Sequence, residues 1–246
     1  MHRYQILIEY VGTNFIGWQI QSKGQSIQKL IQIKISKLLK EKINLVGSGR
    51  TDSGVHAVEQ SAHFDCKKKI KNLDKFLQSI NYFLNIKLVS IINIKKKSFN
   101  FHARFSAKQR IYTYIMFNRI SSPSIEKNRG WHIKKKLDLK LMKKGAKKLL
   151  GTNDFSTFRS SSCNAKSPIR TIKSIKIKEV KNKIQIQFRS QSFLQQQVRS
   201  MVGCLKYLAE KKWDLKKFES IFKSKKRTLC APPAPAHGLF LEKVIY

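Results

Sequence analysis

The sequence predicts an α+β fold from three observations. Hydrophobic periodicity gives the first half the order strand, helix, strand, strand, helix, strand, which is typical of a ferredoxin-like α/β sandwich. The second half repeats this theme loosely. No linker or low-complexity tract separates the halves, so we expect two tightly packed domains, 1–105 and 106–246. With 246 residues, 41% of them hydrophobic, the chain can bury a core without disulfides.

In the first half, strands alternate with two capped helices. Residues 4–11 alternate between apolar and polar, which predicts a strand with one buried face. Ser26 caps one amphipathic helix, and Asn72 begins another. Phe15 and Trp18 lie in the loop before the first helix, where they either contact bases or fill the domain edge. Further strands are expected over 43–46, 58–64 and 86–94.

The second half has the same kinds of element. A strand carries Tyr112, Tyr114 and Met116 on one face, and a basic loop over 118–135 follows it. Asp138 and Asp214 mark the starts of two helices. The remaining elements are strands over 170–178, 183–189 and 239–245 and a long helix over 193–210.

Composition indicates a polyanionic partner. The chain has 51 Lys and Arg against 14 Asp and Glu, a formal net charge of +37, and nucleic acid is the first candidate. Lys, Ile and Asn are all abundant, which is typical of an AT-rich coding sequence, so codon bias is the alternative explanation for part of this charge. Four widely spaced cysteines without a Cys-x-x-Cys pair predict neither a zinc site nor a disulfide framework. No signal peptide or membrane span is visible, so we expect a cytoplasmic protein.

The glycine-rich stretch 47–57, Gly-Ser-Gly-Arg-Thr-Asp-Ser-Gly-Val-His-Ala, is the strongest local motif. Asp52 occupies the position where a dinucleotide fingerprint needs glycine, and Val55 follows Gly54 where a phosphate loop needs lysine. Such a turn can present a carboxylate to a ligand, which makes Asp52 the candidate catalytic group. The structural alternative is that Asp52 only bonds its own turn.

Several motifs occur in the order found in one enzyme family. The sequence around Asp52, Gly-Arg-Thr-Asp-Ser-Gly-Val-His-Ala, resembles the active-site loop of the tRNA pseudouridine synthases of the TruA type. The resemblance implies the pseudouridine synthase fold, in which two α/β halves share a central antiparallel sheet and flank a cleft. The other matching segments are 10–19, Phe101-His102-Ala103-Arg104-Phe105-Ser106-Ala107, Tyr112-x-Tyr114, 154–158, 193–203 and Gly238-Leu239.

The family's activity is the isomerisation of uridine to pseudouridine at positions 38, 39 and 40, in the anticodon stem-loop of tRNA. The reaction moves the ribose C1′ bond from base N1 to base C5 without a redox change, so no metal or other cofactor is expected. The expected partners are tRNA and a second copy of the chain, because family members are homodimers with one tRNA bridging both subunits.

The resemblance assigns Asp52 and Arg199 to catalysis. Asp52 either attacks C1′ or takes a proton from C2′ to give a glycal. Arg199 matches the arginine that pairs with this carboxylate and keeps it charged. From the pattern alone, Arg199 is a surface helix residue.

Four further residues are assigned to substrate binding. Tyr112 matches the tyrosine that stacks on the flipped base, although a core tyrosine fits its strand equally well. Arg50 and Arg104 are expected to contact the RNA backbone or fill the hole left by the flipped nucleotide, with structural ion pairs as the alternative. Leu239 matches the apolar residue of the uracil pocket, with plain core as the alternative. The histidines at 56 and 102 are expected to stabilise loops.

Two other functions compete with this interpretation. A non-catalytic RNA-binding protein explains the charge but gives the Asp52 loop no purpose. A metal-dependent nuclease needs clustered carboxylates, and Asp65 and Asp74 lack a recognisable spacing. One local departure from the family pattern is Gln197-Val198-Arg199-Ser200, where Met and Asn are more usual around the Val-Arg pair.

Overall fold

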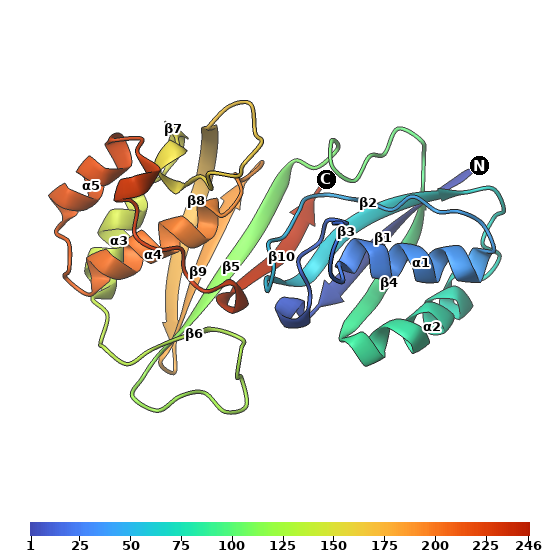
Figure 1. Cartoon of the computed structure of the whole chain (residues 1–246), viewed down its shortest axis with the longest axis horizontal. Helices are drawn as coiled ribbons and strands as arrows, with labels where there is room; N and C mark the ends of the chain where they lie inside the picture. The colour runs from blue at the N-terminus through green and yellow to red at the C-terminus, as the bar shows by residue number, and fades with distance from the viewer. The chain divides into compact units, whose positions relative to one another are not determined.

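The computed structural model describes all residues from 1 to 246 and divides into two compact units (Figure 1). The first comprises Met1–Lys108 and Phe240–Tyr246, and the second comprises Gln109–Leu239. The sequence-based division kept the last strand with the second half. In the structure, residues 240–246 belong to the first unit, because β10 (Leu239–Ile245) pairs in parallel with β3 (His56–Cys66).

β1 lies at the centre of the first unit's strands. The order is β4-β1-β3-β10, and β1 pairs antiparallel with both of its neighbours. A two-residue strand, β2, pairs with β3 and leads into the Asp52 loop. On β1 the predicted inward face is confirmed, since its alternate aromatic and isoleucine side chains are at most 3% exposed. The bounds are β1 His2–Tyr10, β2 Val46–Gly47 and β4 Val89–Lys97.

The first unit's two helices begin where the sequence predicts. α1 (Ile27–Leu39) is capped by Ser26, whose side chain accepts from the Lys29 amide. α2 (Leu73–Leu84) is capped in the same way by Asn72, and it packs against α1 and β4. Of the apolar stripe expected on α2, only Phe76, Ile80 and Leu84 are buried. Short 3-10 helices span Gly12–Asn14 and Asn85–Lys87.

The second unit has its own antiparallel strands in the order β5-β9-β8-β7, and β6 pairs in parallel with β5. β6 and β7 were not predicted, because three- and four-residue strands leave little periodicity in the sequence. The bounds are β5 Gln109–Asn118, β6 Trp131–Ile133, β7 Gly151–Asp154, β8 Ile169–Val180 and β9 Lys183–Ser190.

Helices α3 (Leu139–Lys147), α4 (Gln197–Ala209) and α5 (Leu215–Lys223) complete the second unit, with 3-10 turns at Ser156–Phe158, Arg227–Leu229 and Ala236–Gly238. α3 and α5 begin where the sequence predicts, and the side chains of Asp138 and Asp214 cap them. α4 begins four residues later than the predicted start at 193. Gln196 takes a left-handed φ of 60°, and the Leu194 amide donates to Gln197 Oε1 at 2.8 Å, so a turn replaces the first helical turn.

The protein is therefore a mixed α/β protein with mostly antiparallel strand pairing and five α-helices. The ferredoxin-like relation of the halves and a cleft between them stay predictions. None of the helices is long and apolar enough to cross a membrane.

Candidate active site

Asp52 lies in the loop between β2 and β3, at a tight turn. The Val55 amide donates to the Asp52 carbonyl at 3.2 Å. Gly54 takes a φ of +79°, a backbone conformation that would be strained in any other residue. The Asp52 side chain is half-buried, and Ser53 after it is exposed. The turn therefore holds the carboxylate at a fixed place with access to solvent.

A second loop, residues 11–19, supports this turn through backbone contacts. The Trp18 amide donates to the Thr51 carbonyl at 3.1 Å, and the Ser53 hydroxyl donates to the Phe15 carbonyl at the same distance. The loops approach so closely that a Cβ on Gly12 would lie 1.9 Å from the Val55 carbonyl oxygen. A Cβ on Gly17 would lie 2.6 Å from the Thr51 carbonyl oxygen. Only glycine permits this approach.

The aromatic residues of the supporting loop belong to the core. Phe15 and Trp18 are 3% and 2% exposed, so filling the domain edge is the correct alternative of the two that the sequence allowed. The Trp18 ring lies against Gly47, where a Cβ would come within 2.5 Å of the indole nitrogen. These side chains therefore hold the 11–19 loop in place from the core side and are not positioned to contact a ligand.

Buried polar side chains fix the base of the Asp52 loop. Ser48 donates to Gln60 Oε1 at 2.7 Å, and Gln60 Nε2 donates to the Gly49 carbonyl at 3.0 Å. The hydroxyls of Tyr10 and Thr51 are 2.9 Å apart. Such a fully bonded network restricts the loop to one conformation.

The two predicted substrate-binding arginines of the first unit are exposed. Arg50 lies in the Asp52 loop, and its Nε donates to Gln19 Oε1 at 3.0 Å. Arg104 lies in a different loop, with its guanidinium 5.6 Å from the centroid of the Phe105 ring. The two histidines have the expected loop-stabilising contacts. His56 Nδ1 accepts from the Gly12 amide at 3.0 Å, and His102 Nδ1 accepts from the Arg104 amide at 3.2 Å.

Tyr112 lies on β5 in the second unit and is 8% exposed. Its ring meets the Phe193 ring edge to face, with centroids 5.3 Å apart. Tyr114, two residues on, is fully buried and donates to the Pro235 carbonyl at 2.9 Å. Burial raises the pKa of Tyr114, so this phenol is a structural hydrogen-bond donor.

Arg199 lies in the first turns of α4 and is half-buried. Its Nε donates to the Ala234 carbonyl at 2.8 Å, and the Ala234 amide donates back to the Arg199 carbonyl at 3.0 Å. One turn later, a Cβ on Gly203 would lie 2.2 Å from the Pro232 carbonyl oxygen. The segment 230–235 therefore lies directly on α4 and orients the guanidinium. Leu239 follows this segment at the start of β10 and is 5% exposed.

The sequence-predicted site residues thus fall into two groups. Asp52, Arg50 and Arg104 belong to the first unit, whereas Tyr112, Arg199 and Leu239 belong to the second. Sequence reasoning missed the supporting contacts that Gly12, Gly17 and Ala234 make. The glycines were visible in the sequence, but their contacts join segments about 40 residues apart, and no local pattern reports that.

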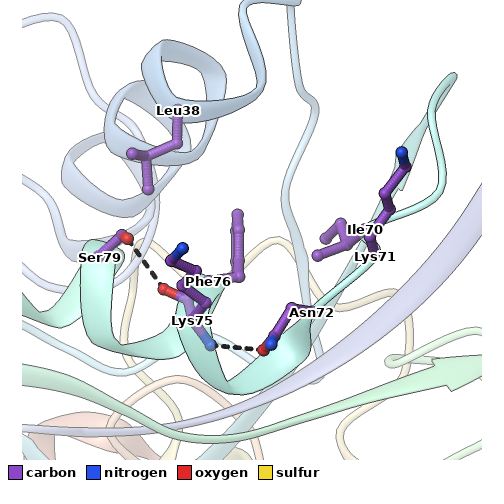
Figure 2. A pocket seen from close by; sticks show the side chains of 7 residues that line it. All are labelled: Leu38, Ile70, Lys71, Asn72, Lys75, Phe76 and Ser79. Carbon is purple, nitrogen blue, oxygen red and sulfur yellow. Dashed lines mark hydrogen bonds between the residues drawn. The ribbon is translucent and has the colours of Figure 1, made fainter.

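A hollow on the first unit lies apart from these residues. It lies beside α2 and has a volume of about 280 Å³. Figure 2 shows the side chains that line it, with Asn72 accepting from the Lys75 amide and Ser79 donating to the Lys75 carbonyl. Its lining offers two lysines as the only ionisable groups and none of the predicted site residues. The lining residues are Leu38, Ile70, Lys71, Asn72, Lys75, Phe76 and Ser79.

No group of three or more His, Cys, Asp or Glu side chains is arranged to hold a metal ion. All four cysteines are free thiols, and the sulfur atoms of Cys204 and Cys230 are 3.4 Å apart. The carboxylate of Asp65 forms an ion pair with Arg3 at 2.7 Å.

Comparison with known proteins identifies the family. A family model described as tRNA pseudouridine synthase matches residues 6–106 and 146–246. A tRNA pseudouridine synthase A of Pelagibacter ubique is 76% identical over 246 residues, which is the full length of both chains. Proteins of the same name from Paramagnetospirillum magneticum and Maricaulis maris are 41% and 40% identical over the whole of this chain and 96% and 98% of theirs. With the Asp52 loop and the Arg199 helix both inside the matched residues, the chain belongs to the tRNA pseudouridine synthase family of the TruA type and is a pseudouridine synthase.

Proposed function

We propose that this enzyme converts uridine to pseudouridine at positions 38, 39 and 40 of the tRNA anticodon stem-loop, with Asp52 as the reacting carboxylate. The observation that carries the proposal is the mounting of Asp52. Its loop is tied to β3 and to the 11–19 loop, yet the side chain stays half-exposed. A carboxylate in a purely structural role has no need of such a rigid, accessible mounting.

The chemistry needs one carboxylate ionised at neutral pH, which is its ordinary state. On one route, an Asp52 oxygen attacks C1′, the C1′–N1 bond breaks, and the base leaves with the electron pair. The base then turns, its C5 attacks C1′, and the Asp52 carboxylate leaves. Loss of the C5 proton and protonation of N1 complete the product. On the other route, Asp52 removes a C2′ proton while the C1′–N1 bond breaks and the base leaves with the electron pair, which gives a glycal. C5 then adds to C1′ as Asp52 returns the proton to C2′, and loss of the C5 proton and protonation of N1 again complete the product. Both routes conserve atoms and oxidation state.

Arg199 and Tyr112 have supporting roles in this proposal. Arg199 pairs with the carboxylate of Asp52 and keeps it charged, and the bonds to Ala234 support this role by fixing the guanidinium stem. Tyr112 stacks on the flipped base and holds it while it turns. The perpendicular Phe193 ring supports this role because it fixes the tyrosine ring. Tyr112 lies outside the residues that the family model matches and inside the full-length alignment to the relatives.

Binding must also supply the few kcal/mol needed to extract a base from the stem. Arg50 and Arg104 are exposed, so they can contact RNA phosphates or fill the position in the stem that the flipped nucleotide leaves. Leu239 offers an apolar surface to the uracil. We also propose that the enzyme works in the cytoplasm as a homodimer with one tRNA bridging both subunits. The net charge of +37 supports a polyanionic substrate of this size.

The test is the pair Asp52→Asn and Asp74→Asn. Each variant removes one negative charge, and Asp74 is an exposed residue in the first turn of α2. With tRNA labelled by tritium at uridine C5, Asp52→Asn should lose tritium release by roughly 10³-fold or more while still binding tRNA. Asp74→Asn should release tritium at the unmodified rate.

Normal release by Asp52→Asn would refute the role of Asp52. Tight tRNA binding without any release by the unmodified protein would instead favour a non-catalytic RNA-binding protein. Three tRNA transcripts that carry a single uridine at position 38, 39 or 40 test the positional claim, and each should gain one pseudouridine. Modification outside the anticodon stem-loop would contradict the proposed substrate.

A further inference from the structure

The segment Ser98–Ser106, between β4 and β5, presents an aromatic ring to solvent from a rigid loop. Phe105 is 75% exposed, although its loop neighbour Ala103 is fully buried. A single exposed apolar side chain is common on protein surfaces, so the case for Phe105 rests on the groups that surround its ring. The proposed function uses Arg104 from this segment and leaves Phe105 without a role.

The loop is held by hydrogen bonds within it and to other parts of the first unit. Nδ1 of His63 accepts from the Ala103 amide at 3.1 Å, and the Tyr246 hydroxyl donates to the Ala103 carbonyl at 2.9 Å. The His102 amide donates to the Ser106 hydroxyl at 2.9 Å. Arg3 donates to the Phe99 and Phe101 carbonyls at 2.7 and 2.8 Å. The backbone that carries Phe105 is therefore fixed before any ligand arrives, which lowers the entropy cost of binding.

One face of the Phe105 ring is already stacked. His102 lies against it with ring centroids 4.4 Å apart and planes 29° from parallel. His102 in turn meets His63 edge to face, with centroids 4.8 Å apart. The Arg104 guanidinium lies 5.6 Å from the Phe105 centroid. Burial lowers the pKa of both histidines, so the stack is neutral at pH 7 beside the arginine.

The charge around this ring fits a polyanion. Residues 95–110 contain six Lys and Arg and no Asp or Glu. Arg3 and Lys97 lie over two further rings of the segment, Phe99 and Phe101, at 5.4 and 5.2 Å. Alternation of aromatic rings with cations is the pattern by which proteins bind unpaired nucleotides, because bases stack on the rings while cations meet the phosphates.

We propose that Phe105, backed by His102 and flanked by Arg104, is a stacking site for an unpaired base of the RNA substrate other than the uridine being isomerised. We name it the Phe105 platform. It rests on the proposed function only in taking RNA as its ligand. By holding a neighbouring base out of the helix, the platform would help keep the stem open while the uridine is extracted.

The test measures RNA binding without turnover, in the Asp52→Asn background, with an unmodified tRNA transcript and with oligouridylate as probes. Phe105→Ala should weaken binding of both about 10-fold, the loss expected for one stacked base. Phe105→Trp should restore binding, and its new indole should be quenched by RNA. Phe105→Leu should restore little, because it keeps apolar area but lacks a π face.

Tyr82→Ala is the matched control, because Tyr82 is also an aromatic residue of the first unit and is also 75% exposed. It should bind RNA unchanged. Heparin, a polyanion without bases, should bind the unmodified protein and Phe105→Ala equally well. The platform is refuted if Phe105→Ala binds RNA within twofold of its parent, if leucine restores binding fully, or if Tyr82→Ala loses as much.

The outcomes separate this inference from the proposed function. If the unmodified enzyme releases no tritium but Phe105→Ala still weakens RNA binding, the platform stands and the proposed reaction fails. If tritium release is normal and Phe105→Ala binds RNA normally, the platform fails and the reaction stands.

Discussion

The Asp52 loop of the first unit and the Arg199 region of the second unit hold their key side chains by different means. The carboxylate loop is fixed largely by backbone, with glycines at 12, 17 and 47 that let it approach its neighbours. The guanidinium is fixed by its own side chain, through Nε and the Ala234 carbonyl. A short acidic side chain depends on the position of its backbone, whereas a long arginine can be oriented along its stem. The carboxylate side should therefore be the less tolerant of small substitutions.

The largest expected effect comes from Gly12→Ala compared with Gly203→Ala. The first places a Cβ 1.9 Å from a backbone oxygen and should lower the free energy of unfolding by about 3 kcal/mol, with loss of tritium release. The second places a Cβ 2.2 Å from the Pro232 oxygen, but a helical alanine recovers about 1 kcal/mol, so the net loss should be about 1–2 kcal/mol.

Urea unfolding of both variants measures this difference. Gly151→Ala is the control, because nothing lies within 4 Å of its Cβ and only its φ of +85° is strained. It should cost about 1 kcal/mol and leave activity intact. If Gly203→Ala proved the more damaging variant, the contrast between the two regions would be wrong.

The next effect is a pH dependence that separates the units. Burial lowers the pKa of His63 in the first unit to about 4, with further lowering from Arg3 and His102 and a small opposing effect of Asp65. The unfolded chain therefore binds more protons than the folded chain between about pH 6.5 and 4. Stability should fall as pH drops through that window, by up to about 3 kcal/mol, and then level off.

His63→Asn removes this titration and keeps an acceptor for the Ala103 amide. Its urea midpoint should change less between pH 7 and 4 than that of the unmodified protein. His237, half-buried in the second unit, also has a pKa lowered by burial. His237→Asn should flatten the curve by a smaller amount. Equal slopes for His63→Asn and the unmodified protein would contradict the assignment.

The smallest effect compares two tyrosine hydroxyls. Tyr10→Phe removes the contact with Thr51 in the Asp52 loop, and Tyr114→Phe removes the bond to the Pro235 carbonyl. Each should cost about 1 kcal/mol of unfolding free energy. Tyr10→Phe should also slow tritium release several-fold, because Thr51 immediately precedes Asp52, the carboxylate that we propose to react. A larger rate loss for Tyr114→Phe would favour the second unit as the more sensitive side.

The sequence predicted local features well and contacts between distant segments poorly. The four helix starts predicted at Ser26, Asn72, Asp138 and Asp214 are confirmed, because the side chain of each of these residues accepts from the amide three residues along. The true start of α4 was missed because Gln196 takes a left-handed conformation that non-glycine residues seldom adopt.

The same limit applies to the site. The motif around Asp52 could be recognised, since its residues are contiguous, and the half-buried position agrees with that reading. The tie from Arg199 to Ala234 spans 35 residues, and the carbonyl it uses belongs to a residue without a functional side chain. The burial of Phe15 and Trp18 could also be decided only from the structure, because aromatic residues in exposed and in buried loops have the same sequence pattern.

The place of β10 has a consequence for biosynthesis. Residues 240–246 follow the whole second unit in the sequence, yet they belong to the first unit, and the Tyr246 hydroxyl donates to Ser61 and to the Ala103 carbonyl. During synthesis, the edge of β3 that pairs with β10 therefore stays uncovered while the second unit is translated. A stalled or truncated polypeptide that lacked residues 240–246 would leave that edge of β3 unpaired, and an unpaired strand edge favours aggregation.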